Sequence, residues 1–114
     1  MNKRVKIDYE EGDIVSVKNG IKDPDFGTDI SGWRGIADSI YNNEKGETLV
    51  EIHWDSITLK NLEMSQLVEC HKQGLYWDMM VIGAEEVQLS EIRDGEEDVE
   101  RIKKKIQEKL SEIA

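Results

Sequence analysis

The sequence predicts a mainly β domain, a small barrel with a short inserted helix and a C-terminal amphipathic helix. Short runs of β-type residues separated by turn residues occupy most of the first ninety positions, which is typical of a small barrel. Near residues 65–73, and again after residue 94, the apolar residues change from alternation to helical spacing. The chain has 114 residues, enough for one modest core. We expect a barrel domain over residues 1–92 and the helix over residues 93–114.

The predicted strands are runs of β-branched and aromatic residues bounded by turn residues. They cover residues 14–18, 33–41, 47–55, 79–82 and 86–89, with a further short strand at 57–59 and an edge strand around Val5 and Ile7. Residues 42–46 form a hairpin turn, in which Gly46 suits a left-handed position. Alternation along 47–55 divides its side chains between the two faces of the sheet. We expect Val50, Ile52 and Trp54 in the core, and Glu51, His53 and Asp55 outside.

Two helices are expected. The shorter covers residues 65–73, with Ser65 as its N-cap and Gly74 as its stop. The longer begins at Asp94, whose spacing to Glu97 resembles a capping box. Its apolar residues form one stripe: Val99, Ile102, Ile106, Leu110 and Ile113. A lone helix of this length is marginal in water, so the stripe should be buried either on the chain's own barrel or on a partner, including a homodimer through this helix.

The charge and cysteine content narrow the class of partner and the compartment. The net charge is −10, so the field of the whole protein repels phosphate backbones and disfavours nucleic acid as a partner, although it would permit a mimic of nucleic acid. The one cysteine, Cys70, excludes an internal disulfide and favours a reducing compartment. We find no signal peptide, membrane span or lipidation motif, and therefore expect a cytoplasmic protein that does not bind membranes.

Three carboxylates in the loop after the first strand, Asp23, Asp25 and Asp29, form a candidate calcium site. Calcium takes six to eight oxygen ligands, mostly from carboxylates and carbonyls on flexible loops. The spacing is not that of an EF-hand, because Gly27 falls one residue early and Arg34 stands where the bidentate glutamate belongs. The alternative is ordinary turn chemistry, in which aspartate side chains bond their own backbone. Both interpretations remain open at this stage.

The side chains of Cys70, His71 and His53 are the second candidate site. They fall short of the four ligands of a structural zinc site unless Asp55 joins them or the chain oligomerises. Cys70 shares a helical face with Leu67, which predicts a buried and inert thiol rather than a nucleophile. The chain also lacks a phosphate-binding glycine loop and a nucleophile elbow. We therefore expect a protein that is not an enzyme.

Aromatic residues near the long loop are the third candidate. Small barrels use grooves lined by aromatic side chains to bind peptides. Trp54 lies on the inward face of its strand and should belong to the core. Trp33 follows the loop and should be half exposed, and Trp77 should cap the barrel. The residues predicted to bind a protein partner are Phe26, Trp33, Tyr76 and Trp77.

Seven residues carry a resemblance to a known fold family: Gly12, Val15, Val17, Gly32, Gly35, Val50 and Val87. They mark a strand, a long loop, a strand entered through glycine, a hairpin, a strand ending in an aromatic residue and a closing strand. This order resembles the SH3-like small barrels. The resemblance implies a protein-interaction module that binds a partner through the 19–33 loop and nearby aromatics. The inserted helix departs from the family pattern, so no particular partner is carried over.

Three strings of the sequence carry a second resemblance: residues 22–26, 32–35 and 54–61. They are similar to a family of small acidic bacterial proteins, some of which are labelled calcium-binding. This resemblance implies the alternative function, a weak calcium-binding protein that uses the acidic loop at residues 23–29.

Overall fold

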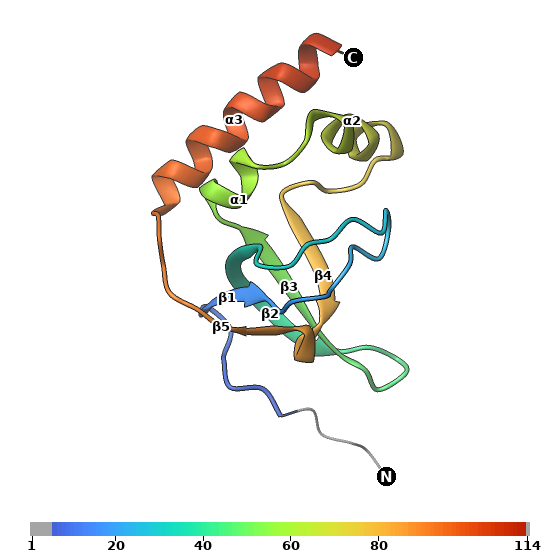
Figure 1. Ribbon diagram of the computed structural model, residues 1–114, viewed down its shortest axis with the longest axis vertical. Helices are drawn as coiled ribbons and strands as arrows, with labels where there is room; N and C mark the ends of the chain where they lie inside the picture. Colours follow the sequence, from blue (N-terminus) through green and yellow to red (C-terminus); the bar gives the residue numbers. More distant parts are fainter. Residues whose placement is uncertain (1–5, 114) are drawn as a thin grey trace.

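A computed structural model describes residues 6–113 of the chain (Figure 1). Its centre is a five-stranded antiparallel sheet with the strand order β4-β3-β2-β1-β5. The strands are β1 (Ile14–Val17), β2 (Arg34–Asn42), β3 (Thr48–Trp54), β4 (Met79–Gly83) and β5 (Val87–Leu89). The helices are α1 (Ser56–Lys60), α2 (Met64–Gln73) and α3 (Glu96–Ile113), with a 3₁₀ turn, η1 (Ala84–Glu86), before β5.

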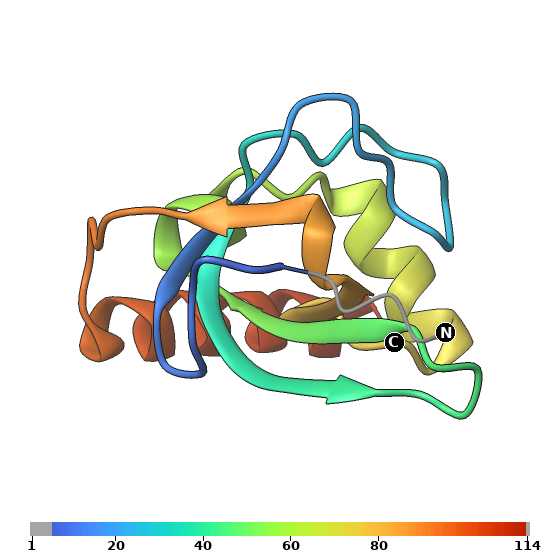
Figure 2. The same cartoon turned by 90° about the horizontal axis from the view of Figure 1, so that it is seen from below.

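The sheet is open, and this corrects the prediction of a closed, mainly β barrel. The strands β4 and β5 are the two edges of the sheet within the described chain, and neither is bonded to the other. The three α-helices together contain more residues than the five strands, so the fold is a mixed α/β domain. Figure 2 shows β2 bending strongly along its length, which gives the sheet curvature without closing it.

The predicted inner face of the third strand is confirmed. Val50 and Ile52 are fully buried and Trp54 is 2% exposed, so one face of β3 points into the core. The hairpin that precedes β3 contains Gly46 at φ +79°, the left-handed position that the turn requires. Leu59 of α1 joins the same core cluster as the inner face of β3.

The region after β3 differs from the prediction in two ways. Residues 57–59, expected as a strand, belong to α1, and Asp55, expected outside, is buried. The cause is a helix cap: the Asp55 carboxylate accepts a hydrogen bond of 2.8 Å from the backbone N–H of Thr58. The β-branched residues Ile57 and Thr58 favour a strand by themselves, but the cap and the tertiary contacts override that preference.

The observed ends of the other two helices agree only in part with the predicted ones. Gly74 ends α2 at φ +69°, as predicted, but the N-cap position is held by Glu63 rather than Ser65. The long helix begins at Glu96 instead of directly after Asp94, whose carboxylate accepts a hydrogen bond from the backbone N–H of Ser56. Ile7 belongs to no strand, and Val5, the other residue of the predicted edge strand, lies outside the described residues.

The apolar stripe of α3 packs on the chain itself. Figure 1 shows α3 lying across α1, with its later turns beside α2. Ile102, Ile106 and Leu110 are buried in the common core, whereas Ile113 at the end of the helix is 56% exposed. The burial of these three side chains favours docking on the chain's own domain, and the homodimer through α3 stays a prediction. None of the helices described within residues 6–113 is long and apolar enough to cross a membrane.

A partly buried ion pair holds the segment that leads into α3. The guanidinium of Arg93 donates to both carboxylate oxygens of Asp55, at 2.6 and 3.0 Å, and to the hydroxyl oxygen of Thr58. Burial opposes the ionisation of Asp55, but the hydrogen bonds from Arg93 and Thr58 outweigh it, so the pKa of Asp55 lies below its ordinary value. This pair, together with the pair of Lys103 and Asp78 at 3.1 Å, holds α3 against the rest of the domain.

Candidate functional site

The four residues predicted to bind a partner all line one cavity of about 270 Å³. Phe26 and Trp33 come from the loop between β1 and β2, and Tyr76 and Trp77 come from the connection between α2 and β4. Apolar side chains complete the wall: Leu62, Leu67, Leu75, Met79 and Met80. Figure 2 shows the loop rising beside α2. The two aromatic pairs, from distant parts of the sequence, line the same cavity.

The loop that carries Phe26 is held in a defined shape. Lys22 and Asp29 form an isolated antiparallel bridge, and the backbone N–H of Asp23 donates to the carbonyl oxygen of Thr28 at 2.7 Å. Gly27 turns the chain at φ +71°, which a residue with a Cβ rarely adopts. Ile30, fully buried, anchors the returning arm of the loop in the core. Phe26 is therefore presented at the tip of a small hairpin.

The aromatic residues differ in how firmly the core holds them. Trp33 is partly buried and meets the ring of Trp54 edge to face, with ring centroids 5.3 Å apart and planes at 84°. Trp54 is a core residue, as its position on the strand predicts. Tyr76 is 75% exposed and Trp77 is partly buried. The wall of the cavity at Trp33 is therefore packed against the core through Trp54, whereas Tyr76 forms an accessible edge.

The loop carboxylates act as turn partners. Asp23 is buried, and its side chain accepts a hydrogen bond of 2.7 Å from the backbone N–H of Asp25. Asp29 accepts hydrogen bonds from the hydroxyl and the backbone N–H of Ser31, and these bonds lower its pKa. The three carboxylates do not gather within 4.8 Å of one another, a distance that another group in the described chain does meet. Calcium binding by this loop stays a prediction, and it would need backbone oxygens as well.

Acidic residues lie beside the aromatic cavity. Asp23 and Asp25 lie in its wall, and an adjacent hollow shares Phe26 and Trp33 with it. That second hollow also contains Asp29, Glu63 and Glu69. Among the described residues that line the two hollows, none is lysine, arginine or histidine. The site is therefore an aromatic depression with carboxylates as its charged neighbours.

Cys70 is buried in the wall of the same cavity, as its helical position predicts. Burial, together with the nearby carboxylates of Asp23 and Asp25, raises the pKa of the thiol, which keeps it protonated. The predicted grouping of Cys70, His71 and His53 does not form in the part of the chain that the structure describes. Asp55, the suggested fourth member, is bound to Arg93 instead.

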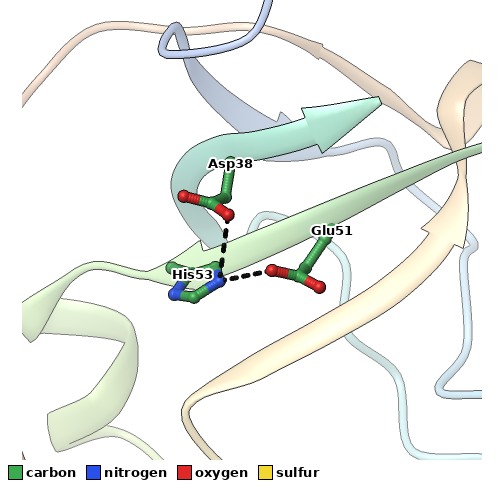
Figure 3. Close-up of side chains that lie close together, drawn as sticks. All are labelled: Asp38, Glu51 and His53. Atoms are coloured by element: carbon green, nitrogen blue, oxygen red, sulfur yellow. Dashed lines mark hydrogen bonds and ion pairs between the residues drawn. The ribbon is translucent and has the colours of Figure 1, made fainter. Parts of the chain in front are cut away.

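The structure gives His53 partners that sequence reasoning missed. Its Nε2 atom lies 2.8 Å from a carboxylate oxygen of Glu51 and 3.7 Å from one of Asp38 (Figure 3). Glu51 and His53 are two residues apart on a predicted strand, so their shared face was available as a signal. Asp38 comes from the neighbouring strand, and its proximity depends on the cross-strand register, which the sequence alone does not provide.

Comparison with protein-family models, with curated proteins and with solved structures found no match. The two family resemblances seen in the sequence therefore stay predictions.

Proposed function

We propose that this protein is a non-catalytic interaction module whose aromatic cavity binds a lysine- or arginine-containing segment of a protein partner. The observation that carries the proposal is the composition of the cavity: Phe26, Trp33, Tyr76 and Trp77 line it, and the charged residues around it are acidic. Aromatic faces attract Lys and Arg heads, and the apolar stems of these side chains pack well on apolar walls.

The size of the cavity supports a side chain as its occupant. Pockets for small molecules and cofactors have volumes of about 300–1,000 Å³. The cavity of about 270 Å³ lies just below that range, and it opens beside a second acidic hollow instead of closing over a ligand. A peptide can place one long basic side chain in the cavity and lay its backbone across the neighbouring surface. The net charge of −10 would also steer a basic partner toward the protein.

We also propose that the sheet has an SH3-like arrangement. The closing strand β5 pairs with the first strand, and a long loop separates β1 from β2, which supports an open, SH3-like arrangement of the sheet. A cytoplasmic setting is supported by the single cysteine, which is buried as a free thiol. The binding of calcium by the loop at residues 23–29 is kept as an outcome of the test below.

The test uses the full chain and three synthetic heptapeptides with blocked ends, in which alanine alternates with lysine, with glutamate or with glutamine. Calorimetry should show binding of the lysine peptide that weakens with added salt. Tyr76→Ala should weaken it by about 2- to 30-fold, the equivalent of one cation–π contact. Tyr76 is 75% exposed, so its removal leaves the core intact.

Tyr41→Ala is the matched control, because Tyr41 is an exposed tyrosine on β2 that does not line the cavity. Equal effects of the two tyrosine variants, or equal binding of the glutamate peptide, would contradict the proposal. A calcium titration runs in parallel. Calcium binding that Asp25→Asn abolishes, without binding of the lysine peptide, would favour the cation-binding function instead.

A further inference from the structure

A second cluster lies outside the aromatic cavity, on the outer face of β2 and β3. There the Nε2 atom of His53 is approached by one oxygen of Glu51 at 2.8 Å and one of Asp38 at 3.7 Å. All three ligand atoms lie within 4.8 Å of one another. Figure 3 shows the two carboxylates reaching the same ring nitrogen from two different strands. A single cation placed between them could be bound by the ring nitrogen and by both carboxylates.

The local structure explains why these side chains converge. Glu51 and His53 share the outward face of β3, because the residues between and beside them point into the core. On β2 the register shifts between Ala37, which pairs with Ile52, and Ser39, which pairs with Glu51. Asp38 is thus the extra residue of a β-bulge. Bulges turn a side chain away from regular alternation and are frequent next to functional sites.

The strands also approach closely at this point. A Cβ atom on Gly35 would lie 2.1 Å from the carbonyl oxygen of His53, so only glycine fits opposite this part of β3. His53 pairs with Ile36 on β2 and with Met79 on β4, so strands on both sides hold the backbone that carries the histidine. A fixed backbone lowers the entropy lost when a ligand orders the side chain.

The charges of the cluster are not balanced by basic residues. Among the described residues, the ion pairs of Asp38 and Glu51 are both with His53, and no lysine or arginine nitrogen comes within 4.0 Å of either carboxylate. Two adjacent carboxylates in a chain of net charge −10 repel each other. A dication would neutralise them and still use the nitrogen of His53.

We propose that Asp38, Glu51 and His53 form a binding site for Zn²⁺. The donor set of one imidazole nitrogen and two carboxylate oxygens suits zinc, whereas calcium prefers ligands that are all oxygen. In a tetrahedral site with bonds of about 2.0–2.1 Å, neighbouring ligand atoms lie about 3.4 Å apart. The observed distances of 2.8 and 3.7 Å lie on either side of that value, so small rotations of the two carboxylates would complete the geometry.

The surroundings leave the fourth coordination position open. The side chain of Asp38 is 56% exposed and that of His53 is 42% exposed. Both line a hollow of about 630 Å³ between the sheet and α3. Zinc held by three protein ligands carries water or another ligand in its remaining position, and this hollow provides the room for it.

The proposal is tested by calorimetric titration of the full chain with zinc chloride, and by the visible spectrum after addition of Co²⁺ as a stand-in for zinc. We expect one zinc ion per chain and an intense cobalt spectrum of tetrahedral type. His53→Ala should weaken zinc binding by about 100-fold or more, because even outer-shell changes cost about 10- to 100-fold. Asp38→Asn and Glu51→Gln should each weaken it as well.

His71→Ala is the matched control, since His71 is the other histidine of the chain and lies exposed on α2. It should bind zinc as the unaltered protein does. Circular dichroism confirms that each variant is folded, which we expect because the cluster is on the surface. The proposal is overturned if the unaltered protein binds no zinc, if His53→Ala binds it with unchanged affinity, or if His71→Ala abolishes binding. These results are independent of peptide binding at the aromatic cavity.

Discussion

The docking of α3 can be tested by shortening one buried isoleucine. Ile106 is 8% exposed and lies in the middle of the apolar stripe, where α3 packs on the rest of the domain. Ile106→Ala removes three carbon groups from this interface. Ile113 belongs to the same stripe and the same helix but is 56% exposed, so Ile113→Ala is a matched control.

The expected loss of stability follows from burial. Each buried methylene contributes about 0.8 kcal/mol, so three groups at this depth account for about 2 kcal/mol. The cavity left behind adds to this loss, which brings the total to about 2–3.5 kcal/mol, within the range measured for such substitutions. In a chain of this length, 1 kcal/mol corresponds to about 4 °C in Tm, so the melting temperature should fall by roughly 10 °C. Ile113→Ala should change the free energy of unfolding by less than about 0.5 kcal/mol.

Urea unfolding followed by circular dichroism and tryptophan fluorescence measures both variants, and light scattering gives their mass. A destabilised Ile106→Ala that stays at the mass of the unaltered protein is the expected result. If Ile106→Ala were no less stable than Ile113→Ala, the stripe would not be buried on this domain, and the description of α3 would be wrong. If the unaltered protein had the mass of a dimer and Ile106→Ala had the mass of a monomer, the result would instead support the homodimer through α3.

Two further predictions concern the sheet and the partly buried ion pair of Arg93 and Asp55. Gly35→Ala should destabilise the fold by at least about 1–3 kcal/mol, because the new Cβ would collide with the carbonyl oxygen of His53. Gly95→Ala is the control and should be tolerated, since a Cβ there meets nothing within 4 Å. Thermal melts compare the two. The pKa of Asp55 is lowered from its ordinary value of 3.8. Its pairing with Arg93 therefore stabilises the fold above about pH 4, and this contribution is lost as the pH falls through the lowered pKa. The difference in Tm between the unaltered protein and Asp55→Asn should therefore shrink in acid, and a constant difference would contradict the assignment.

Local patterns in the sequence predicted those features that depend on neighbouring residues. Alternation placed Val50, Ile52 and Trp54 in the core, and helical spacing identified the buried positions of α3. Gly46 and Gly74 take the left-handed conformations that their turns require. In each case the period or turn residue is sufficient, because the physical cause lies within a few positions of the chain.

Features that depend on distant partners could not be predicted in this way. The helix α1 forms where β-branched residues suggested a strand, because Asp55 caps it and Arg93, far along the chain, holds Asp55 in place. Closure of the sheet depends on whether its two edge strands meet, and no local signal decides that. Asp38 joins His53 only through a bulge in the cross-strand register. The aromatic residues were identified individually, but their common cavity is a result of the tertiary fold.

Binding of a basic peptide at the aromatic cavity can be observed residue by residue in a nuclear magnetic resonance titration. The three tryptophans each have one indole N–H, which gives one resonance per residue in a ¹⁵N correlation spectrum. Addition of the alternating lysine peptide should shift the signals of Trp33 and Trp77, which line the cavity, together with the backbone signals of residues 23–29 and 75–77. The backbone signals of α3 and of residues 38 and 53 should stay in place. Shifts confined to α3 or to the outer face of the sheet, with Trp33 and Trp77 unchanged, would contradict peptide binding at this cavity.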